Sequence, residues 1–479
     1  MNKIDSRFHK NVITPIKAEL TSAKSLIDHN RVDIIVKVAY LHSLLKNDIN
    51  SINYYEKLYL ETIDSFTRGT FHEPGNSTKK SPQDYIHQFK ILIDDINQNG
   101  FDQEKSLIPI SPHGTPLDGA HRIAIASYLN LELPVVKLKD IDCKYDINFF
   151  QSRSNDPKFI YKLIDELINF DDNIRIAIIW PFAKVEQIQD IKDFFGNEFI
   201  FSLSMNLNNN GVNNLCASAY ESENWIGSSL NNWGGTWNKS EKTFLANYKT
   251  HIVIYKSISS EHDILLKTKF RAKYKNSKHC IHTTDSKNET IKISQVTFYP
   301  DSEKYLNNIE LAKLKGIYKF VTDNFINTTD IVVTGSYFLS VLGLRKSNDI
   351  DFFIKNDHLA SNKKLLVESH NDYIKCYDFS LDDIFNFKTS TFNFLNIRFL
   401  PLEQICSFKK KRKERKDFDD IKLIELFLNE SYGLKLKFLK SKKNLTYTTS
   451  KMKRAFRNST IDLIKKVGLY NKIKTIMKK

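Results

Sequence analysis

The sequence predicts a multidomain protein of mixed α/β and α+β class, and three observations support that class. The chain has 479 residues, which is enough for about three domains. Hydrophobic residues make up 41% of it and aromatic residues 12%, so it can form hydrophobic cores and is not wholly disordered. Apolar, β-branched runs typical of strands alternate with amphipathic stretches typical of helices.

Changes in composition divide the chain into five segments. Residues 171–174 precede a new apolar strand, and residues 300–305 form a second boundary. The Asn-rich stretch 206–214 is expected to be a loop. We therefore expect a polar lead-in helix over residues 1–30, a first domain over 31–145, a second over 172–300, a third over 305–432 and a basic tail over 435–479.

Positive charge is concentrated at the carboxyl end. The formal net charge of the chain is +15, and residues 435–479 hold fifteen Lys or Arg residues against one acid, Asp462. The remainder is nearly neutral. A neutral body with a basic tail indicates contact with a surface rather than a body that binds nucleic acid.

The cysteines and the apolar runs indicate a cytoplasmic protein. The five cysteines are far apart and no CxxC pair occurs, which excludes a disulfide framework and a zinc site. The amino-terminal sequence has no apolar signal segment. No run of about 18 apolar residues occurs, so we expect no segment that spans a bilayer.

The third domain contains the most specific motif. An apolar run is followed by Gly335-Ser336, a short helix, and then Asp349 and Asp351. Alternation along a strand would place both carboxylates on one face. Such a pair attracts a cation, and Mg²⁺ prefers oxygen ligands and keeps positions for phosphate. Free N–H groups at the helix start can hold a phosphate, so we expect a metal-dependent phosphoryl or nucleotidyl transfer site.

This motif resembles that of the DNA polymerase β-like nucleotidyltransferases, in which Gly-Ser and a helix precede Asp-x-Asp on the next strand. The resemblance implies nucleotide binding by Gly335 and Ser336 and metal binding by Asp349 and Asp351. It also implies phosphate binding by Arg345, because the Gly-x-Arg sequence that precedes the aspartates is similar to that of the antitoxin-linked and sugar-linked branches of this family.

The family has two further features, a third carboxylate and a closing helix. The family adds a third carboxylate on a later strand, but the strand expected at 392–400 contains no acid, and Asp378 is the substitute that we consider. A helix expected over 408–424 resembles the family's closing helix. It could offer basic residues to phosphates or form a solvated charged face; these residues are Lys409, Arg412 and Lys416.

The first domain contains a loop that leads from a short strand into a helix. Residues 107–110 form the expected strand, and the sequence Asp-Gly-Ala-His-Arg leads into the helix. Gly119 permits a tight turn, and His121 and Arg122 lie at the helix start. Backbone N–H groups, an imidazole and a guanidinium at such a place converge on an anion.

This loop resembles the signature of the ParB/sulfiredoxin fold and is most similar to its small-molecule kinase branch. The resemblance implies that Asp118, Gly119 and Arg122 bind a nucleotide phosphate and that His121 is catalytic. The loop has no cysteine and no helix-turn-helix pattern follows, which argues against sulfiredoxin chemistry and against DNA partition. The alternative is that His121 and Arg122 only cap and solvate the helix.

The second domain places His282 ahead of Thr283, Thr284 and Asp285, which could orient the ring or cap the next helix. An imidazole so placed can carry a phosphoryl group. The order of elements resembles that of nucleoside diphosphate kinase, which implies a ferredoxin-like fold. The residues at matching places are Pro181, Tyr220, Arg271, His282, Asp285 and Ser286.

The departures from that family bear on activity. Trp180 stands where the family has a phosphate-binding Lys, and Thr283 stands where it has Gly. The Glu that supports the histidine is expected to be replaced near Ile293. The resemblance implies catalysis by His282 with nucleotide contacts from Tyr220 and Arg271, and the alternative is a domain that binds nucleotide without transferring phosphate.

The tail has the pattern of a basic amphipathic helix, because its apolar residues fall at helix-face spacings with Lys and Arg between them. This pattern favours contact with an anionic inner-membrane surface. Nucleic acid is the less favoured partner. The apolar positions are Met452, Phe456, Leu463, Val467, Tyr470, Ile473 and Met477.

Three successive domains thus each resemble a fold that handles nucleotides or phosphoryl groups. We expect a bacterial enzyme, cytoplasmic and peripheral on the inner membrane, that uses Mg²⁺ and a nucleoside triphosphate (ATP or CTP). It would transfer a nucleotidyl or phosphoryl group to a small molecule or sugar, by analogy in surface-polysaccharide assembly. The alternatives are a nucleic-acid-modifying or toxin-type nucleotidyltransferase and an inactive nucleotide-binding scaffold.

Overall fold

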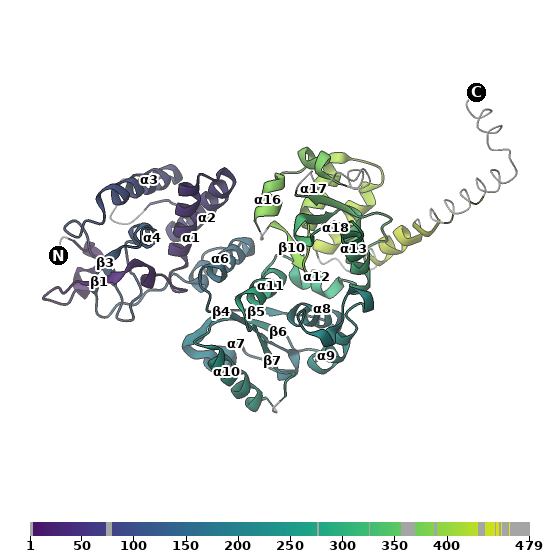
Figure 1. Cartoon of the computed structure of the whole chain (residues 1–479), viewed down its shortest axis with the longest axis horizontal. Helices are drawn as coiled ribbons and strands as arrows, with labels where there is room; N and C mark the ends of the chain where they lie inside the picture. The colour runs from purple at the N-terminus through teal and green to yellow at the C-terminus, as the bar shows by residue number, and fades with distance from the viewer. Residues whose placement is uncertain are drawn as a thin grey trace, which may run out of the picture. The chain divides into compact units, whose positions relative to one another are not determined.

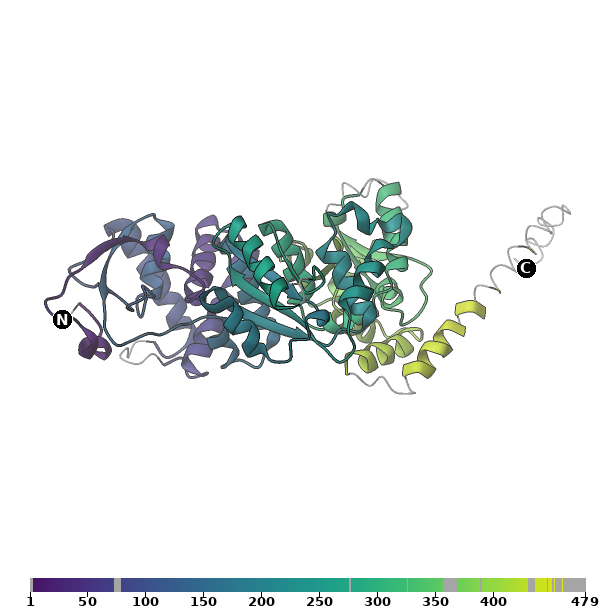
Figure 2. The same ribbon diagram turned by 90° about the horizontal axis from the view of Figure 1, so that it is seen from below.

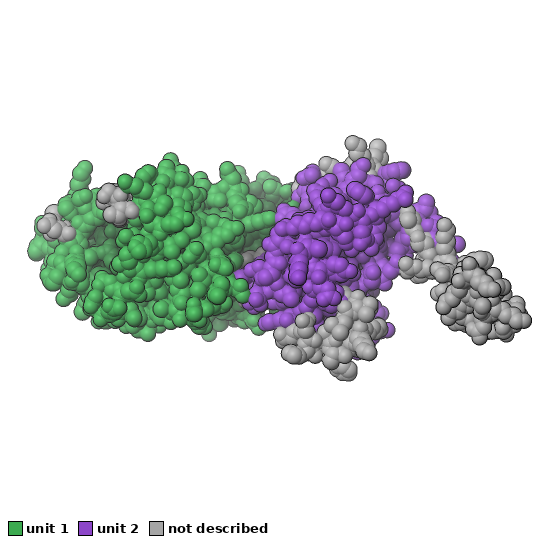
Figure 3. Space-filling view, turned by 90° about the horizontal axis from the view of Figure 1, so that it is seen from above, with its two compact units in different colours: residues 1–222, 236–303 green, residues 223–235, 304–479 purple. Residues whose placement is uncertain are grey.

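The chain forms two compact units of mixed helices and small sheets (Figures 1 and 3). Unit 1 comprises residues 1–222 and 236–303, and unit 2 comprises residues 223–235 and 304–479. The expected first and second domains therefore lie within one unit. The computed structural model describes residues 3–459 except 73–78, 275–276, 325, 356–368, 388–389, 430–435, 446, 450–451 and 453–458.

The amino-terminal part of unit 1 is built on a three-stranded sheet with the order β1-β3-β2. β3 (Glu132–Lys137) pairs antiparallel with β1 (Glu19–Ser22) and parallel with β2 (Ile108–Ile110). α4 (Ala120–Tyr128) is the crossover between the two parallel strands. The other helices are α1 (Val32–Lys46), α2 (Ile49–Thr67), α3 (Pro82–Asn99), α5 (Ile147–Gln151) and α6 (Pro157–Phe170).

The lead-in helix expected over residues 1–30 is wrong. This stretch contains two short 3-10 helices, Ser6–Asn11 and Ala23–Leu26, and between them β1, which forms an edge of the sheet. Ile4, Phe8 and Val12 are buried against Leu138 and neighbouring residues. Tertiary contacts therefore fix the conformation of this polar stretch.

The second part of unit 1 is a four-stranded antiparallel sheet with the order β5-β6-β4-β7. β4 (Ile174–Ile179) is central and pairs with β6 (Thr250–Lys256) and β7 (Ile281–Thr283), and β5 (Phe199–Met205) pairs with the outer side of β6. The helices of this part are α7 (Ile188–Phe195), α8 (Asn209–Ala219), α9 (Gly235–Thr243), α10 (Ser260–Lys273) and α11 (Lys287–Thr297).

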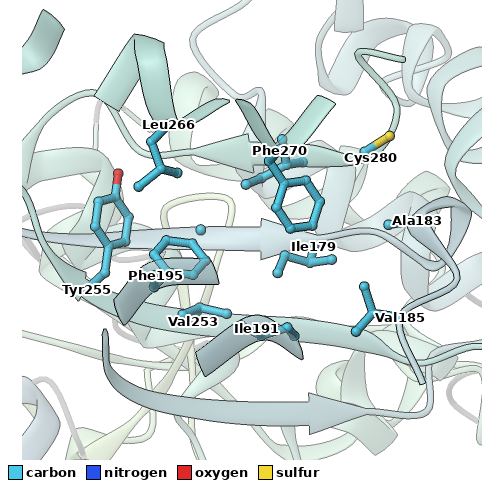
Figure 4. Packing of buried hydrophobic residues seen from close by; sticks show 12 residues of the cluster. Ile179, Ala183, Val185, Ile191, Phe195, Val253, Tyr255, Leu266, Phe270 and Cys280 are labelled. Carbon is cyan, nitrogen blue, oxygen red and sulfur yellow. The ribbon is translucent and has the colours of Figure 1, made fainter. Parts of the chain in front are cut away.

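One face of this sheet packs on α7 and α10 (Figure 4). Ala177 and Ile179 alternate with Ile176 and Ile178 along β4, so the strand is buried on both faces and reads as a continuous apolar run. The helices contribute mainly aromatic and aliphatic side chains, among them Ile191, Phe195, Leu266 and Phe270.

The Asn-rich stretch 206–214 is not wholly a loop, because α8 begins at Asn209. The Asn208 side chain accepts a hydrogen bond from the Gly211 N–H at 2.8 Å and so caps the helix. Asn213 and Asn214 are fully buried in α8. Composition indicated a loop here, and a capping contact with burial produces a helix instead.

Unit 2 contains a mixed four-stranded sheet with the order β10-β11-β8-β9. β8 (Ile331–Thr334) pairs antiparallel with β9 (Asp351–Ile354) and parallel with β11 (Ile397–Phe399), and β10 (Phe392–Phe394) pairs antiparallel with β11. The helices are α12 (Ser302–Asn308), α13 (Leu311–Asp323), α14 (Gly335–Val341), α16 (Leu381–Asn386), α17 (Leu402–Arg412) and α18 (Asp417–Leu428).

Two expected elements of the third domain are each divided into two. The strand expected at 392–400 is the hairpin β10–β11, because Leu395 and Asn396 both adopt positive φ angles, 49° and 58°, as a tight two-residue turn requires. The helix expected over 408–424 ends at Arg412, since Lys413 is left-handed with φ 57°, and α18 follows it.

The first helical turns of the expected tail pack onto α18. Leu436 and Leu439 are buried in a cluster with Leu423 of α18. The apolar tail positions from Phe456 to Met477 lie outside the described residues. Among the helices that the structure describes, none combines the length and the apolar character needed to cross a bilayer.

Candidate functional site

The end of β8 and the start of β9 bring Asp351 against Gly335. Thr334 and Asp351 are partners in the β8–β9 ladder, and α14 starts at the next residue. Gly335 has φ +64°, and a Cβ built there would lie 2.1 Å from Asp351 Oδ2. The backbone N–H of Ser336 is close enough to the Asp351 carboxylate to lower its pKa. Glycine is thus required here by both its conformation and the close approach of a carboxylate.

Asp349 approaches the same turn from the loop that precedes β9. Contrary to the expectation of two carboxylates on one strand, β9 begins only at Asp351. The Asp349 Oδ1 atom lies 3.2 Å from Ser347 Oγ and 3.5 Å from Ser336 Oγ. The two serine hydroxyls are 2.7 Å apart. Both carboxylates therefore converge on the Gly335-Ser336 turn, although one of them comes from a loop.

A buried histidine holds the other oxygen of Asp351. The Nε2 atom of His370 lies 3.5 Å from Asp351 Oδ1, and its Nδ1 atom lies 3.3 Å from the Tyr377 hydroxyl. Burial raises the pKa of Asp351, but His370, the Ser336 N–H and Lys409 outweigh burial and lower it below its ordinary value. No sequence motif marked His370, because only the fold brings it to the start of β9.

The basic residues expected to bind phosphates form buried ion pairs. Arg345 donates from Nη1 to both oxygens of Asp420 at 2.9 and 2.6 Å. Lys409, which is 4% exposed, lies 3.0 Å from Asp420 and 3.2 Å from Asp417. Arg412 pairs with Asp417 at 2.6 Å. These three cations are therefore paired with acids of the same unit, whereas Lys416 is exposed and pairs with Glu414.

The expected substitute for a third carboxylate lies elsewhere. Asp378 is exposed, pairs with Lys411 and accepts a hydrogen bond from Ser407 Oγ at 3.2 Å. On β11 the polar residue is Arg398, which donates to Thr391 Oγ1 at 3.0 Å. Within the described ranges, no group of three His, Cys, Asp or Glu side chains is arranged to hold a metal ion. Two carboxylates still fit Mg²⁺, which takes its remaining ligands from water and substrate phosphate.

In the first part of unit 1 the expected loop opens onto a pocket. Gly119 is left-handed with φ +79°, and Arg122 lies 3.5 Å from Asp118 across the turn. Asp118 and Arg122 line a pocket of about 490 Å³. Its wall also contains Lys3, His9 and Lys105, so Lys3, Lys105 and Arg122 bring cations from three segments to one space.

His121 is packed away as a neutral ring. Its Nε2 atom lies 2.8 Å from the Tyr59 hydroxyl, and its ring meets the edge of Phe89 at a centroid distance of 4.9 Å. Burial lowers the pKa of His121 well below its ordinary value, and the charges of Lys37 and Lys79 lower it further. These contacts favour a structural role over the expected catalytic one.

The second part of unit 1 gives His282 a carboxylate partner. His282 lies on β7, and its Nε2 atom is 2.9 Å from Glu289 Oε1. The supporting Glu expected to be lost near Ile293 is therefore present one helical turn earlier. Tyr220 packs its ring against His282 at 4.8 Å. Ser286 caps α11 by accepting from the Glu289 N–H, and Asp285 pairs with Lys267.

A lysine lies over the Tyr220 ring beside this histidine. Lys239 Nζ lies 5.2 Å from the centre of the Tyr220 ring and 3.4 Å from His279 Nδ1. Burial lowers the pKa of Lys239 to about 8. The Nε atom of Arg271 is buried without an acceptor in the described part of the chain. Lys239 was not marked by any motif, yet it supplies charge near the position where Trp180 replaces a lysine.

Comparisons of the chain with protein-family models, with curated proteins and with solved structures found no match. Its function is therefore inferred from the residues of these sites alone.

Replacing Gly335 by Ala should destabilise unit 2 by about 1–3 kcal/mol, because the new Cβ meets both an unfavourable φ and the Asp351 carboxylate. Urea denaturation measures this change. Gly114→Ala is the matched control, since Gly114 also has positive φ but no atom lies within 4 Å of its Cβ position. Equal losses in the two variants would show that the contact with Asp351 contributes nothing.

Proposed function

We propose that unit 2 is a metal-dependent nucleotidyltransferase that uses Mg²⁺ and ATP or CTP and acts on a small molecule or sugar. The single observation that carries this proposal is the convergence of Asp349 and Asp351 on the Gly335-Ser336 turn, at the start of α14. The strand order of the unit, with β8 between an antiparallel β9 and a parallel β11, also supports the nucleotidyltransferase fold.

The chemistry follows from the residues around the turn. Asp349 and Asp351 would be the protein ligands of the metal, which supplies positive charge to the phosphate oxygens of the nucleotide. The Ser336 N–H and His370 both stabilise the charged form of Asp351, and His370 lies beside one oxygen of this carboxylate. The carboxylates are thus oriented before the substrate binds, which is how electrostatic stabilisation becomes effective.

The proposal is tested by incubating the full chain with Mg²⁺, each nucleoside triphosphate and a panel of sugar phosphates. Release of pyrophosphate that depends on both the metal and the acceptor is expected. If no nucleotide binds in isothermal titration with Mg²⁺ present, unit 2 is not a nucleotidyltransferase.

A second candidate function, nucleotide binding without turnover, is favoured by one specific observation. Arg398 is the polar residue on β11, where the family would have its third carboxylate, and Asp378 is turned toward Lys411. Under this alternative, titration shows Mg²⁺-dependent nucleotide binding while no acceptor supports pyrophosphate release.

We also propose that His282 accepts a phosphoryl group, with unit 1 adopting a ferredoxin-like arrangement consistent with the order β5-β6-β4-β7. Incubation with radiolabelled ATP should leave an acid-labile, base-stable phosphate that is lost in His282→Ala. The support is the Glu289 contact and the nearby Lys239 and Arg271.

His262 provides a matched control for this label, because its Nε2 atom pairs with Glu198 at 3.3 Å in the same unit. His262→Ala should retain full labelling. Absence of label in the unaltered chain, with nucleotide still bound, would leave this part of unit 1 as a binding domain.

A further inference from the structure

The helix that follows residue 435 has one face fixed to unit 2. Residues 436–445 and 447–449 are helical. Leu436 and Leu439 are 2% and 8% exposed and pack with Leu423. Lys443 Nζ lies 3.1 Å from Asp420, and Lys346 lies over the ring of Tyr447 at 5.7 Å. Positions 436, 439 and 443 share one face of the helix 436–445, and Tyr447 in the next helical stretch also contacts unit 2.

The opposite face carries a row of exposed apolar side chains. Phe438, Leu445 and Met452 are 70%, 67% and 67% exposed. Phe438 and Leu445 are seven residues apart, which is nearly two helical turns, so they lie on one side of the helix, and Met452 continues the same seven-residue spacing in the sequence. Scattered exposed apolar residues need no explanation, but an aligned row beside a large excess of charge indicates an interaction surface.

Charge identifies the class of partner. Residues 435–479 carry fifteen Lys or Arg residues and one acid. The acids beside this helix, Asp419 and Asp420, are already paired with cations, among them Lys442 and Lys443. The remaining excess of positive charge favours an anionic partner, and that partner would also have to cover the apolar stripe. Nucleic acid offers phosphates to the cations but no apolar layer to these three residues, whereas an anionic bilayer offers both.

We propose that this helix docks unit 2 on an anionic lipid bilayer, with Phe438, Leu445 and Met452 in the interface. The sequence alone began the apolar stripe at Met452. The structure extends it into the helix that packs on α18. Figure 2 shows the backbone of this helix in yellow, leading toward the carboxyl end. Unit 2 would then be held against the bilayer through a packed helix. This inference is independent of the proposed nucleotidyl transfer.

The test is sedimentation of the full chain with vesicles of phosphatidylcholine alone and of phosphatidylcholine mixed with phosphatidylglycerol. The unaltered chain should bind only the mixed vesicles, and binding should weaken as salt shortens the Debye length. The double variant Phe438→Ser, Leu445→Ser should lower the partition coefficient about tenfold or more, because it removes two large apolar side chains from the interface.

Leu230→Ser is the matched control, since Leu230 is 79% exposed in the same unit and lies outside the stripe. It should leave the partition coefficient unchanged. Unchanged circular dichroism melting of the double variant is expected because both residues are exposed. Equal binding of the double variant and the unaltered chain would overturn the proposal. So would a self-association measured by analytical ultracentrifugation that the double variant abolishes while neither vesicle binds.

Discussion

Asp351→Asn and Asp349→Asn should each lower metal-dependent nucleotide turnover by roughly 10²–10³-fold, the loss that follows removal of one preorganised electrostatic group. Asn keeps the shape of Asp, so the close packing against the turn at Gly335 is preserved. What disappears is the negative charge that attracts Mg²⁺. Isothermal titration with Mg²⁺ and a nucleoside triphosphate, together with pyrophosphate release, measures both effects.

Asp378→Asn is the control for these variants. Asp378 is an exposed carboxylate of the same unit, paired with Lys411 and not with Ser336. It should retain full turnover. Unchanged turnover in both Asp349→Asn and Asp351→Asn would eliminate this site. Loss of turnover in Asp378→Asn would mean that the third carboxylate had been correctly expected from the sequence.

The local parts of this site could be predicted from the sequence because they depend on neighbouring residues. The apolar run that ends in Gly335-Ser336 predicted both the strand β8 and the start of α14. The next apolar run predicted the strand β9, on which Asp351 lies. Asp349 was misplaced by one element, since its contacts with Ser347 and Ser336 hold it in the loop and no periodicity reports such contacts.

Residues that lie close to a site in space but far from it along the chain could not be predicted. His370 reaches Asp351 from 19 positions along the chain, and Arg345 reaches Asp420 from 75 positions away. Neither pair has a spacing that local structure would produce. The same holds for Lys239 and His279, which are 40 residues apart. A search of the helix after His282 for every acid one or two turns away would have found Glu289.

The breaks that divide two expected elements could not be predicted, for a different reason. Lys413 and the pair Leu395-Asn396 adopt positive φ angles without glycine, so no turn residue except Asn396 marked them. The buried pairing of Lys409 and Arg412 with Asp417 accompanies the turn between α17 and α18. Likewise β1 forms because Glu19–Ser22 finds a partner in β3, although its own sequence is polar.

Replacement of Asp420, the buried carboxylate between α17 and α18, should cause the largest loss of stability in unit 2. Asp420 is 1% exposed and lies within 3.1 Å of cations from Arg345, Lys409 and Lys443. Asp420→Asn leaves buried cations with less compensating charge and should reduce the free energy of unfolding of unit 2 by about 3–5 kcal/mol. Asp419→Asn, at an adjacent and more exposed carboxylate with contacts of 3.6 Å and longer, should cost about 1 kcal/mol or less.

The pH dependence of this difference follows from the pKa of Asp420. Burial raises that pKa, but Lys409, Arg345 and Lys443 outweigh burial, so it lies below its ordinary value. A carboxylate with a lowered folded-state pKa contributes its stability above the unfolded-state pKa, about 3.9, and loses it as pH falls through the folded-state value. The gap in urea midpoint between the unaltered chain and Asp420→Asn should therefore be constant near neutral pH and narrow below about pH 4. A gap that stayed constant into acid, or an Asp419→Asn variant as unstable as Asp420→Asn, would mean that charge pairing at Asp420 does not hold α17 and α18 together.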